Sequence, residues 1–212
     1  MSELVFDCTD AGADPYAAAP TVVFRLRIAE TTGQPIGGIM LRAQLRIEPL
    51  KRRYSDAEAE RIGDLFGERP RWGDTMKPLQ FANVTQMVPA FSGSVEVDVP
   101  VPVTYDFEVA TAKYFHGLED GEIPFILLFS GTALLDQQGS LSIEQIPWHK
   151  ETSYRLPVKV WREAMDVHFP NSTWLRIRCD TLDHLQRFKS RNTLATWDET
   201  FEVLLRVAEA SS

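Results

Sequence analysis

The sequence contains four histidines and two cysteines, and the histidines and Cys179 are the first candidates for metal binding or nucleophilic catalysis. The densest group runs from His168 to His184 and also holds Cys179, Asp180 and Asp183. Zinc sites usually present their ligands in compact pairs such as C-x-x-C or H-x-x-x-H, and this group contains neither. We therefore expect Asp180 to cap a helix and His184 to lie on a surface, and we predict neither a metal site nor a cofactor.

Cys179 is the candidate nucleophile, with His149 or His168 as its base. It sits beside a predicted helix start, a position that can activate a thiol, but a plain structural thiol is the alternative. Ser130 lacks the G-x-S-x-G context of a nucleophile elbow, and phosphate-binding glycine loops are missing from the sequence. The sequence therefore favours a non-catalytic protein. It leaves open an enzyme with a Cys179/His-centred site.

Arginines alternate with apolar residues in the two clearest strand patterns, 22–29 and 39–48. If these strands pair as a hairpin, their outward side chains share one basic face, formed by Arg25, Arg27, Arg42 and Arg46. Such a face could bind an acidic partner. The alternative is an ordinary solvated sheet face, partly balanced by Glu30 and Glu48.

Trp72 is the second candidate for binding a partner. It lies in the aperiodic stretch 69–78, which follows a predicted helical insertion near 55–67. Ser55 and Glu58 have the spacing of a capping box at the start of that insertion. An exposed Trp can anchor a protein partner, and the alternative is that Trp72 folds back onto its own sheet.

The most apolar run, 123–135, is expected to be a central strand covered on both faces. Alternating strands are predicted around it. The valine-rich region 94–109 reads as an edge strand or as two strands separated by a kink, because Pro100 and Pro102 cannot donate to a ladder. Residues 1–152 should form an antiparallel β body, either a β-sandwich or an open sheet. A small-ligand site in the β interior remains a further possibility.

Residues 153–212 have helical periodicity and are predicted to form a C-terminal helical segment of the same domain. A helix is expected over 157–168, and a second capping box is formed by Thr196 and Glu199. The fold class is therefore α+β, with the C-terminal helical segment packed on the β body.

Net charge, hydropathy and cysteine count indicate which partners and which cellular compartment to expect. The formal net charge of −8 argues against nucleic-acid binding. The sequence shows neither a signal peptide nor a run of about 20 apolar residues that could cross a membrane. Two cysteines do not make a disulfide framework, so we expect a cytoplasmic protein. A homo-oligomer is compatible with these observations.

The segment 154–170 carries a resemblance to a known group of proteins. It contains Tyr154-Arg155-Leu156-Pro157-Val158 and Trp161-Arg162, and it is followed by Trp174-Leu175-Arg176 and Asp180-Thr181-Leu182. This pattern resembles an uncharacterised actinobacterial family often encoded near uptake nickel–iron hydrogenase genes. The resemblance implies an accessory role and supplies no catalytic residues.

A looser likeness concerns the order of the elements. Strands followed by Tyr154-x-Leu156-Pro157-Val158 before a helix are similar in layout to the export chaperone SecB, which binds unfolded clients without nucleotide. The insertion at about 50–105 departs from that layout. Together, these features predict an accessory, scaffold or chaperone-like protein that binds another protein. The first resemblance implies a hydrogenase subunit or precursor as that partner.

Overall fold

The computed structural model describes residues 2–103, 109–137, 140–172 and 177–210. It contains eight strands and seven α-helices in these ranges and is an α+β structure. Two compact units are present, residues 1–171 and residues 172–212. None of the described helices is long and apolar enough to span a bilayer.

Two antiparallel sheets build the first unit. The first sheet has the order β1-β2-β5, with bounds Leu4–Ala13, Thr21–Glu30 and Ser94–Pro102. The second sheet has the order β4-β3-β6-β7, and β8 pairs with the other half of β6. Its strands are β3 (Ile36–Ile47), β4 (Leu79–Val88), β6 (Glu122–Gln137), β7 (Ser140–Gln145) and β8 (Glu151–Pro157).

The inner faces of the sheets pack on each other through aromatic rings. Phe6 of β1 stacks on Phe129 of β6 with centroids 4.5 Å apart. Phe24 of β2 meets Phe125 of β6 at 5.7 Å and Tyr154 of β8 at 6.1 Å, both edge-on. The β body is therefore a β-sandwich, which is one of the two predicted alternatives. Buried apolar side chains fill its interior.

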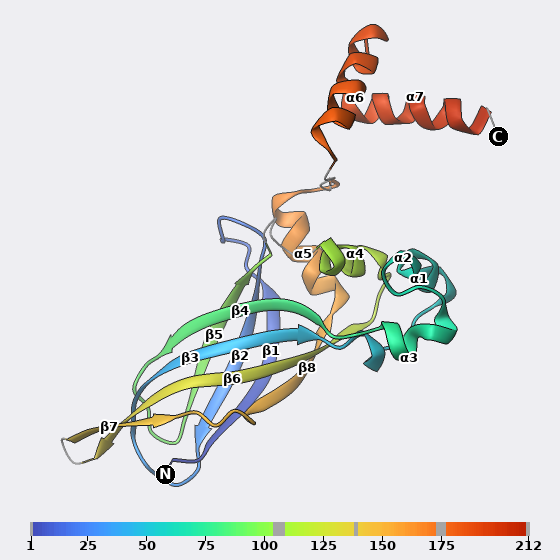
Figure 1. Cartoon of the computed structure of the whole chain (residues 1–212). Helices are drawn as coiled ribbons and strands as arrows, with labels where there is room; N and C mark the ends of the chain where they lie inside the picture. Colours follow the sequence, from blue (N-terminus) through green and yellow to red (C-terminus); the bar gives the residue numbers. More distant parts are fainter. Residues whose placement is uncertain (1, 104–108, 138–139, 173–176, 211–212) are drawn as a thin grey trace. The chain divides into compact units, whose positions relative to one another are not determined.

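β6 is the central strand that the apolar run 123–135 predicted, because β3 lies on one side of it and β7 and β8 on the other (Figure 1). The expectation that both faces are covered was wrong. The alternate positions Ile123, Phe125 and Leu127 are buried, whereas Ile126 and Leu128 are only half-buried. One side of β6 faces the sandwich interior and the other belongs to a partly exposed sheet surface.

Short helices form the insertion between β3 and β4. They are η1 (Pro49–Lys51), α1 (Asp56–Arg61), α2 (Gly63–Phe66), η2 (Arg69–Arg71) and α3 (Trp72–Thr75). The predicted capping box is confirmed: the Glu58 amide donates to Ser55 Oγ, and Glu58 accepts from the Ser55 amide. Figure 1 shows this insertion at the opposite end of the second sheet from the β6–β7 hairpin.

Several boundaries differ from those predicted. β1 runs from Leu4 to Ala13 and pairs with β2 along this length, although its second half is rich in polar and small residues. β5 ends at Pro102, and helix α4 (Val109–Gly117) begins at the last residue of the region 94–109 that was expected to be extended. Residues 153–157 belong to β8, so the sheet continues past residue 152. The predicted strand 174–178 falls mainly outside the described residues.

Helix α5 (Val158–His168) is the C-terminal element that packs on the sandwich. Its apolar side, with Val158, Val160, Trp161 and Ala164, is buried, and it contacts β1, β2 and β8. Trp161 also stacks on Phe115 of α4 at 5.0 Å. The second unit is a hairpin of α6 (Cys179–Arg191) and α7 (Trp197–Ala210), whose capping box at Thr196 and Glu199 is confirmed.

Candidate functional site

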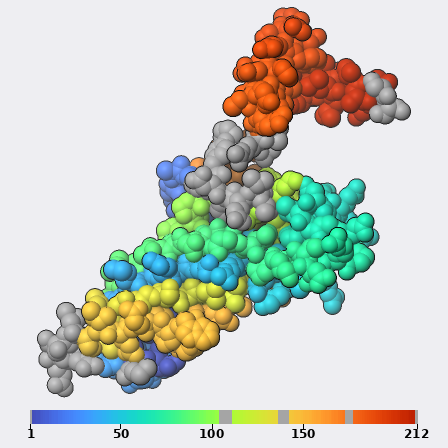
Figure 2. Space-filling view, in the orientation of Figure 1, coloured from blue at the N-terminus to red at the C-terminus, as the bar shows by residue number. Residues whose placement is uncertain are grey.

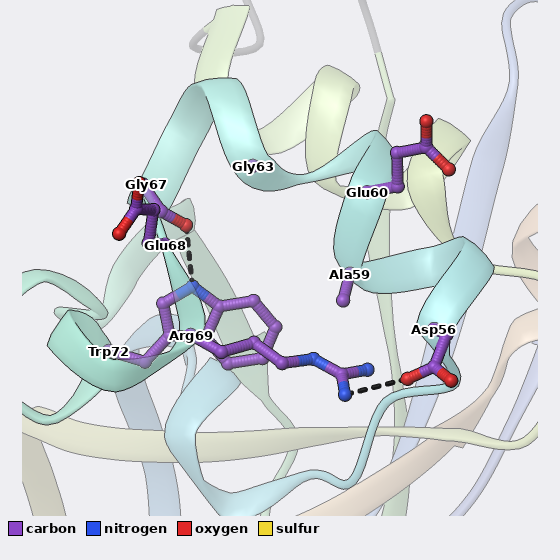
Figure 3. A pocket seen from close by; sticks show the side chains of 8 residues that line it. All are labelled: Asp56, Ala59, Glu60, Gly63, Gly67, Glu68, Arg69 and Trp72. Carbon is purple, nitrogen blue, oxygen red and sulfur yellow. Dashed lines mark hydrogen bonds and ion pairs between the residues drawn. The ribbon is translucent and has the colours of Figure 1, made fainter.

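Trp72 lies in the helical insertion, beside an open hollow of about 500 Å³ (Figure 3). Its ring is half-buried and meets Tyr54 edge-on at 5.3 Å. Its Nε1 donates to the Gly67 carbonyl at 2.9 Å, and the Arg69 guanidinium lies 5.8 Å from its ring. Trp72 thus packs back onto its own chain.

The polar groups of this hollow hold the insertion together. Arg69 is ion-paired with Asp56 at 2.7 Å and donates to the Ser55 carbonyl at 2.7 Å. Figure 3 shows the Arg69 side chain extended across the Trp72 ring toward Asp56. Because these donors and the ring already have partners within the chain, the hollow is better explained as structure than as a binding site.

The insertion also contains a group of buried polar side chains that bond to one another. Glu58 accepts from Arg52 Nη2 at 2.7 Å and from the Glu119 amide at 2.9 Å, and both charged side chains are over nine-tenths buried. The Tyr54 and Tyr114 hydroxyls are 2.7 Å apart, and burial raises the pKa of Tyr54 to about 12. The hydrogen bond from Glu119 to Glu58 connects the insertion to the turn before β6, so the role of this group is structural.

The predicted four-arginine face does not exist. β2 and β3 do not pair with each other but belong to different sheets, so their outward side chains lie on opposite sides of the sandwich. On the first sheet, Arg25 is ion-paired with Asp98 at 3.2 Å and Asp10 at 4.0 Å. Arg27 lies opposite Asp7 and Glu96 in the strand register. Acidic neighbours therefore balance this pair of arginines.

Arg42 and Arg46 belong to the outer face of the second sheet. We use this name for the outward side chains of β3, β4, β6, β7 and β8, together with the loop before β8. Arg42 lies opposite Thr85 of β4 and Ser130 of β6. Arg46 Nη2 donates to Gln44 Oε1 at 2.9 Å, on the same face.

Large apolar side chains are exposed on this same outer face. Met40 and Met87 are cross-strand partners and are 57% and 60% exposed. Ile143 of β7 is 71% exposed and lies opposite Leu134. Trp148, in the loop before β8, is 88% exposed. Figure 2 shows the strands of this face side by side, from β4 in green through β3 in blue to β6 in yellow.

A hollow of about 640 Å³ lies between Trp148 and the polar side chains of the outer face. Its lining includes Arg42, Asn83, Ser130 and Glu151. Within the described ranges, these four side chains make no hydrogen bond or ion pair with another residue. The hollow thus differs from the one at Trp72, since a cation, a carboxylate, an amide and a hydroxyl are left with unused bonding capacity.

The structure places the candidate catalytic residues as follows. Cys179 is exposed at the first residue of α6. The two nitrogens of His168 lie 3.3 Å from the Ala164 carbonyl and 2.8 Å from the Ala17 carbonyl. In the described ranges, Cys179 has no hydrogen bond to a histidine, and no three or more His, Cys, Asp or Glu side chains cluster as metal ligands do. Cys8 is buried, and burial raises its pKa to about 12.

Sequence reasoning found Arg42 and Arg46 but missed Met87, Ile143 and Trp148. The signal for Trp148 was its position after Pro147 in a break between strands. Ile143 alternates with polar neighbours in the short strand β7, and Met87 stands between Gln86 and Val88 near the end of β4, so neither was recognised as outward-facing.

Comparison with solved structures gives only weak likenesses. A β-glucosidase from Kluyveromyces marxianus aligns at 8% identity and a TM-score of 0.28, covering 73% of this chain and 15% of that chain. β-Glucosidase 3B from Thermotoga neapolitana aligns at 13% identity and a TM-score of 0.27, covering 73% and 17%. The chain therefore spans less than a fifth of these enzymes. The putative ApaA protein from Bordetella pertussis aligns at 10% identity and a TM-score of 0.29, covering 74% and 95%.

No curated protein matches this sequence. A family model does match it, over residues 1–212, and its description is a family of unknown function, DUF6084. The chain belongs to the family of unknown function DUF6084.

Proposed function

We propose that this protein is a non-catalytic accessory protein that binds another protein through the outer face of its second sheet. The observation that carries the proposal is that exposed Trp148, Met40, Met87 and Ile143 lie on the same face as Arg42. Tryptophan, methionine and arginine are enriched in protein interfaces, and Trp and Arg dominate their binding energy.

The chemistry of this face also describes its partner. Arg42 and Arg46 project from it, with Glu151 at the edge of the hollow. A partner that places an acidic side chain near Arg42 and apolar side chains over Met40 and Met87 would use both features. Electrostatic attraction would then set the association rate, and apolar burial would contribute most of the affinity.

A chaperone-like mode is the variant that the methionine pair favours. Met40 and Met87 are flexible, polarisable side chains, and surfaces rich in methionine can bind many different apolar segments. A chaperone would bind several unfolded clients, whereas a dedicated accessory protein would bind one folded partner. Competition between an unfolded client and the isolated partner for the Trp148 surface would distinguish the two modes.

The hydrogenase link rests on the sequence resemblance, and a comparative pull-down from the native host tests it. The wild-type chain and its Trp148→Ala and Met87→Asp variants serve as baits during growth that induces hydrogenase. A component held by the wild type should be lost by both variants, with affinity at least about tenfold weaker for the purified pair. A hydrogenase subunit or precursor among these proteins would support the link. Its absence would count against the link but not against the binding face.

Two matched controls use exposed residues elsewhere on the sandwich. Tyr16→Ala removes an aromatic ring that is 95% exposed in the β1–β2 loop, and Val5→Asp adds a charge to the outside of the first sheet. Both variants should bind the partner as the wild type does. Equal loss in the controls, or full binding by Trp148→Ala and Met87→Asp, would reject the outer face as the binding surface.

A further inference from the structure

The C-terminal hairpin does not bury a core of its own. Among its described residues, 177–210, Thr200 is the only buried side chain. The larger apolar residues Leu182, Leu185, Phe188, Phe201 and Leu204 are only half-buried. Two helices of this length cannot enclose an apolar core by themselves, since bundles need more helices to surround it.

α7 has a wider apolar surface than one neighbouring helix can cover. At 100° per residue, the apolar residues of α7 occupy an arc of roughly 200° around the helix axis, with Val203 at one border and Leu205 at the other. This arc is about twice as wide as the apolar stripe of an ordinary surface helix. Leu205 lies at one border of this arc and is 63% exposed, and Trp197 is 37% exposed. α6 already occupies part of the arc, so the remainder calls for a second helix.

The distribution of charge along the chain indicates which helix covers the rest of this arc. Residues 172–212 contain six acidic and six basic side chains, so the whole net charge of −8 belongs to residues 1–171. Two copies of the body repel each other, whereas two hairpins carry no net repulsion.

The two helices of the hairpin also carry opposite net charge. α6 has Arg187, Lys189 and Arg191 against two aspartates, and α7 has four acidic residues against Arg206. In a four-helix arrangement, α7 can lie between its own α6 and the α6 of a second copy. Every helix is then flanked by helices of opposite charge, a pattern that favours this arrangement over α7 against α7.

We infer that the C-terminal hairpin is a homodimerisation element, in which α7 of each chain covers its exposed apolar flank with α6 of a second copy. The two hairpins together form a four-helix bundle around Leu204, Leu205 and Phe201. This inference rests on the hairpin and on the charge of the chain, and it does not depend on the proposed binding face.

The first test is the mass of the full-length chain as a function of concentration, measured by sedimentation equilibrium. The wild type should form a species of twice the 24.0 kDa chain mass. Leu205→Glu should weaken dimerisation at least about tenfold, because it would bury a charge in the bundle. Leu205 is exposed within the single hairpin, so the variant keeps its fold. Leu50→Glu, at a residue 56% exposed on the body, is the matched control and should dimerise normally.

A charge-exchange experiment tests the pairing of α7 with the second α6. One chain carries Arg187→Glu with Arg191→Glu, and the other carries Glu202→Lys with Glu209→Lys. Each variant by itself places like charges across the contact between α7 and the second α6, so it should be mainly monomeric. An equal mixture of the two variants should form mixed dimers. Circular dichroism checks that both retain wild-type helicity.

Three results would overturn the inference. These are a wild-type chain that stays monomeric at all concentrations, a dimer that Leu205→Glu leaves intact, and failure of the two helical charge variants to form mixed dimers.

Discussion

Glu30 shows how one buried carboxylate can organise a loop. It ends β2, and its two oxygens accept hydrogen bonds from the amides of Glu3, Thr32 and Gln34 and from the Thr32 hydroxyl, at 2.6–3.1 Å. Burial alone would raise the pKa of Glu30, but these hydrogen bonds outweigh it and hold the pKa at about 2. The connection from β2 to β3 is therefore stabilised by Glu30 in its charged form.

The linked prediction is a loss of stability in acid. The folded pKa lies below the unfolded value of about 4.3, so the stabilisation is complete above that value and is lost as pH falls toward 2. Its size is at most about 3 kcal/mol. Urea unfolding at pH 7, 4 and 2.5 should show that Glu30→Gln is destabilised at pH 7 and converges with the wild type in acid. Glu60→Gln, at an exposed carboxyl, is the control. An equal offset at every pH would contradict the linkage.

At the scale of the element, Gly131 lets β6 and β3 approach each other. Its φ is +135°, a backbone region that residues with a Cβ rarely adopt. A Cβ at this position would lie 2.1 Å from the Met40 carbonyl oxygen. Gly131 is thus required by close backbone packing in the middle of the central strand.

Gly131→Ala should therefore destabilise the first unit by about 2–4 kcal/mol, because both the φ angle and the contact oppose a side chain. Gly33→Ala is the matched control. Its φ is also positive, at +83°, but nothing lies within 4 Å of the added Cβ, so a smaller loss is expected. Thermal denaturation of both variants measures the difference. Similar melting temperatures would show that β3 can move away at little cost.

At the scale of the whole molecule, the two sheets are joined by a cluster of aromatic rings. Phe24 is fully buried and meets the rings of Phe81, Phe125 and Tyr154 from three strands of the opposite sheet. This ring connects the sheets directly, so the sandwich should unfold as one cooperative structure. The hairpin 172–212 is a separate compact unit.

Phe24→Ala should cost the sandwich about 3–5 kcal/mol, since it leaves a cavity between the sheets. The effect should appear in a single unfolding transition followed by tryptophan fluorescence and by far-ultraviolet dichroism. Phe201→Ala in the half-buried hairpin is the comparison, and it should leave the sandwich transition unchanged. Two separate sheet transitions in Phe24→Ala would refute the single-unit interpretation.

The sequence by itself determined those features whose physics is local. Period-2 alternation identified β2 and β3, and Ser55 and Thr196 marked helix starts through hydrogen bonds that span only three residues. The prolines of β5 predicted an edge strand, and β5 is an edge of the first sheet. Pro100 and Pro102 share the parity that points away from β2, so their missing amides cost no ladder bond.

Only the tertiary structure decided which strands become neighbours. Alternation shows that a strand has an inner and an outer side, but it does not say which sheet the strand joins. For this reason Arg25 and Arg27 were wrongly grouped with Arg42 and Arg46. The same long-range pairing brings Met40, Met87, Ile143 and Trp148 from separate segments onto one face, where no local pattern in the sequence had indicated exposed apolar residues.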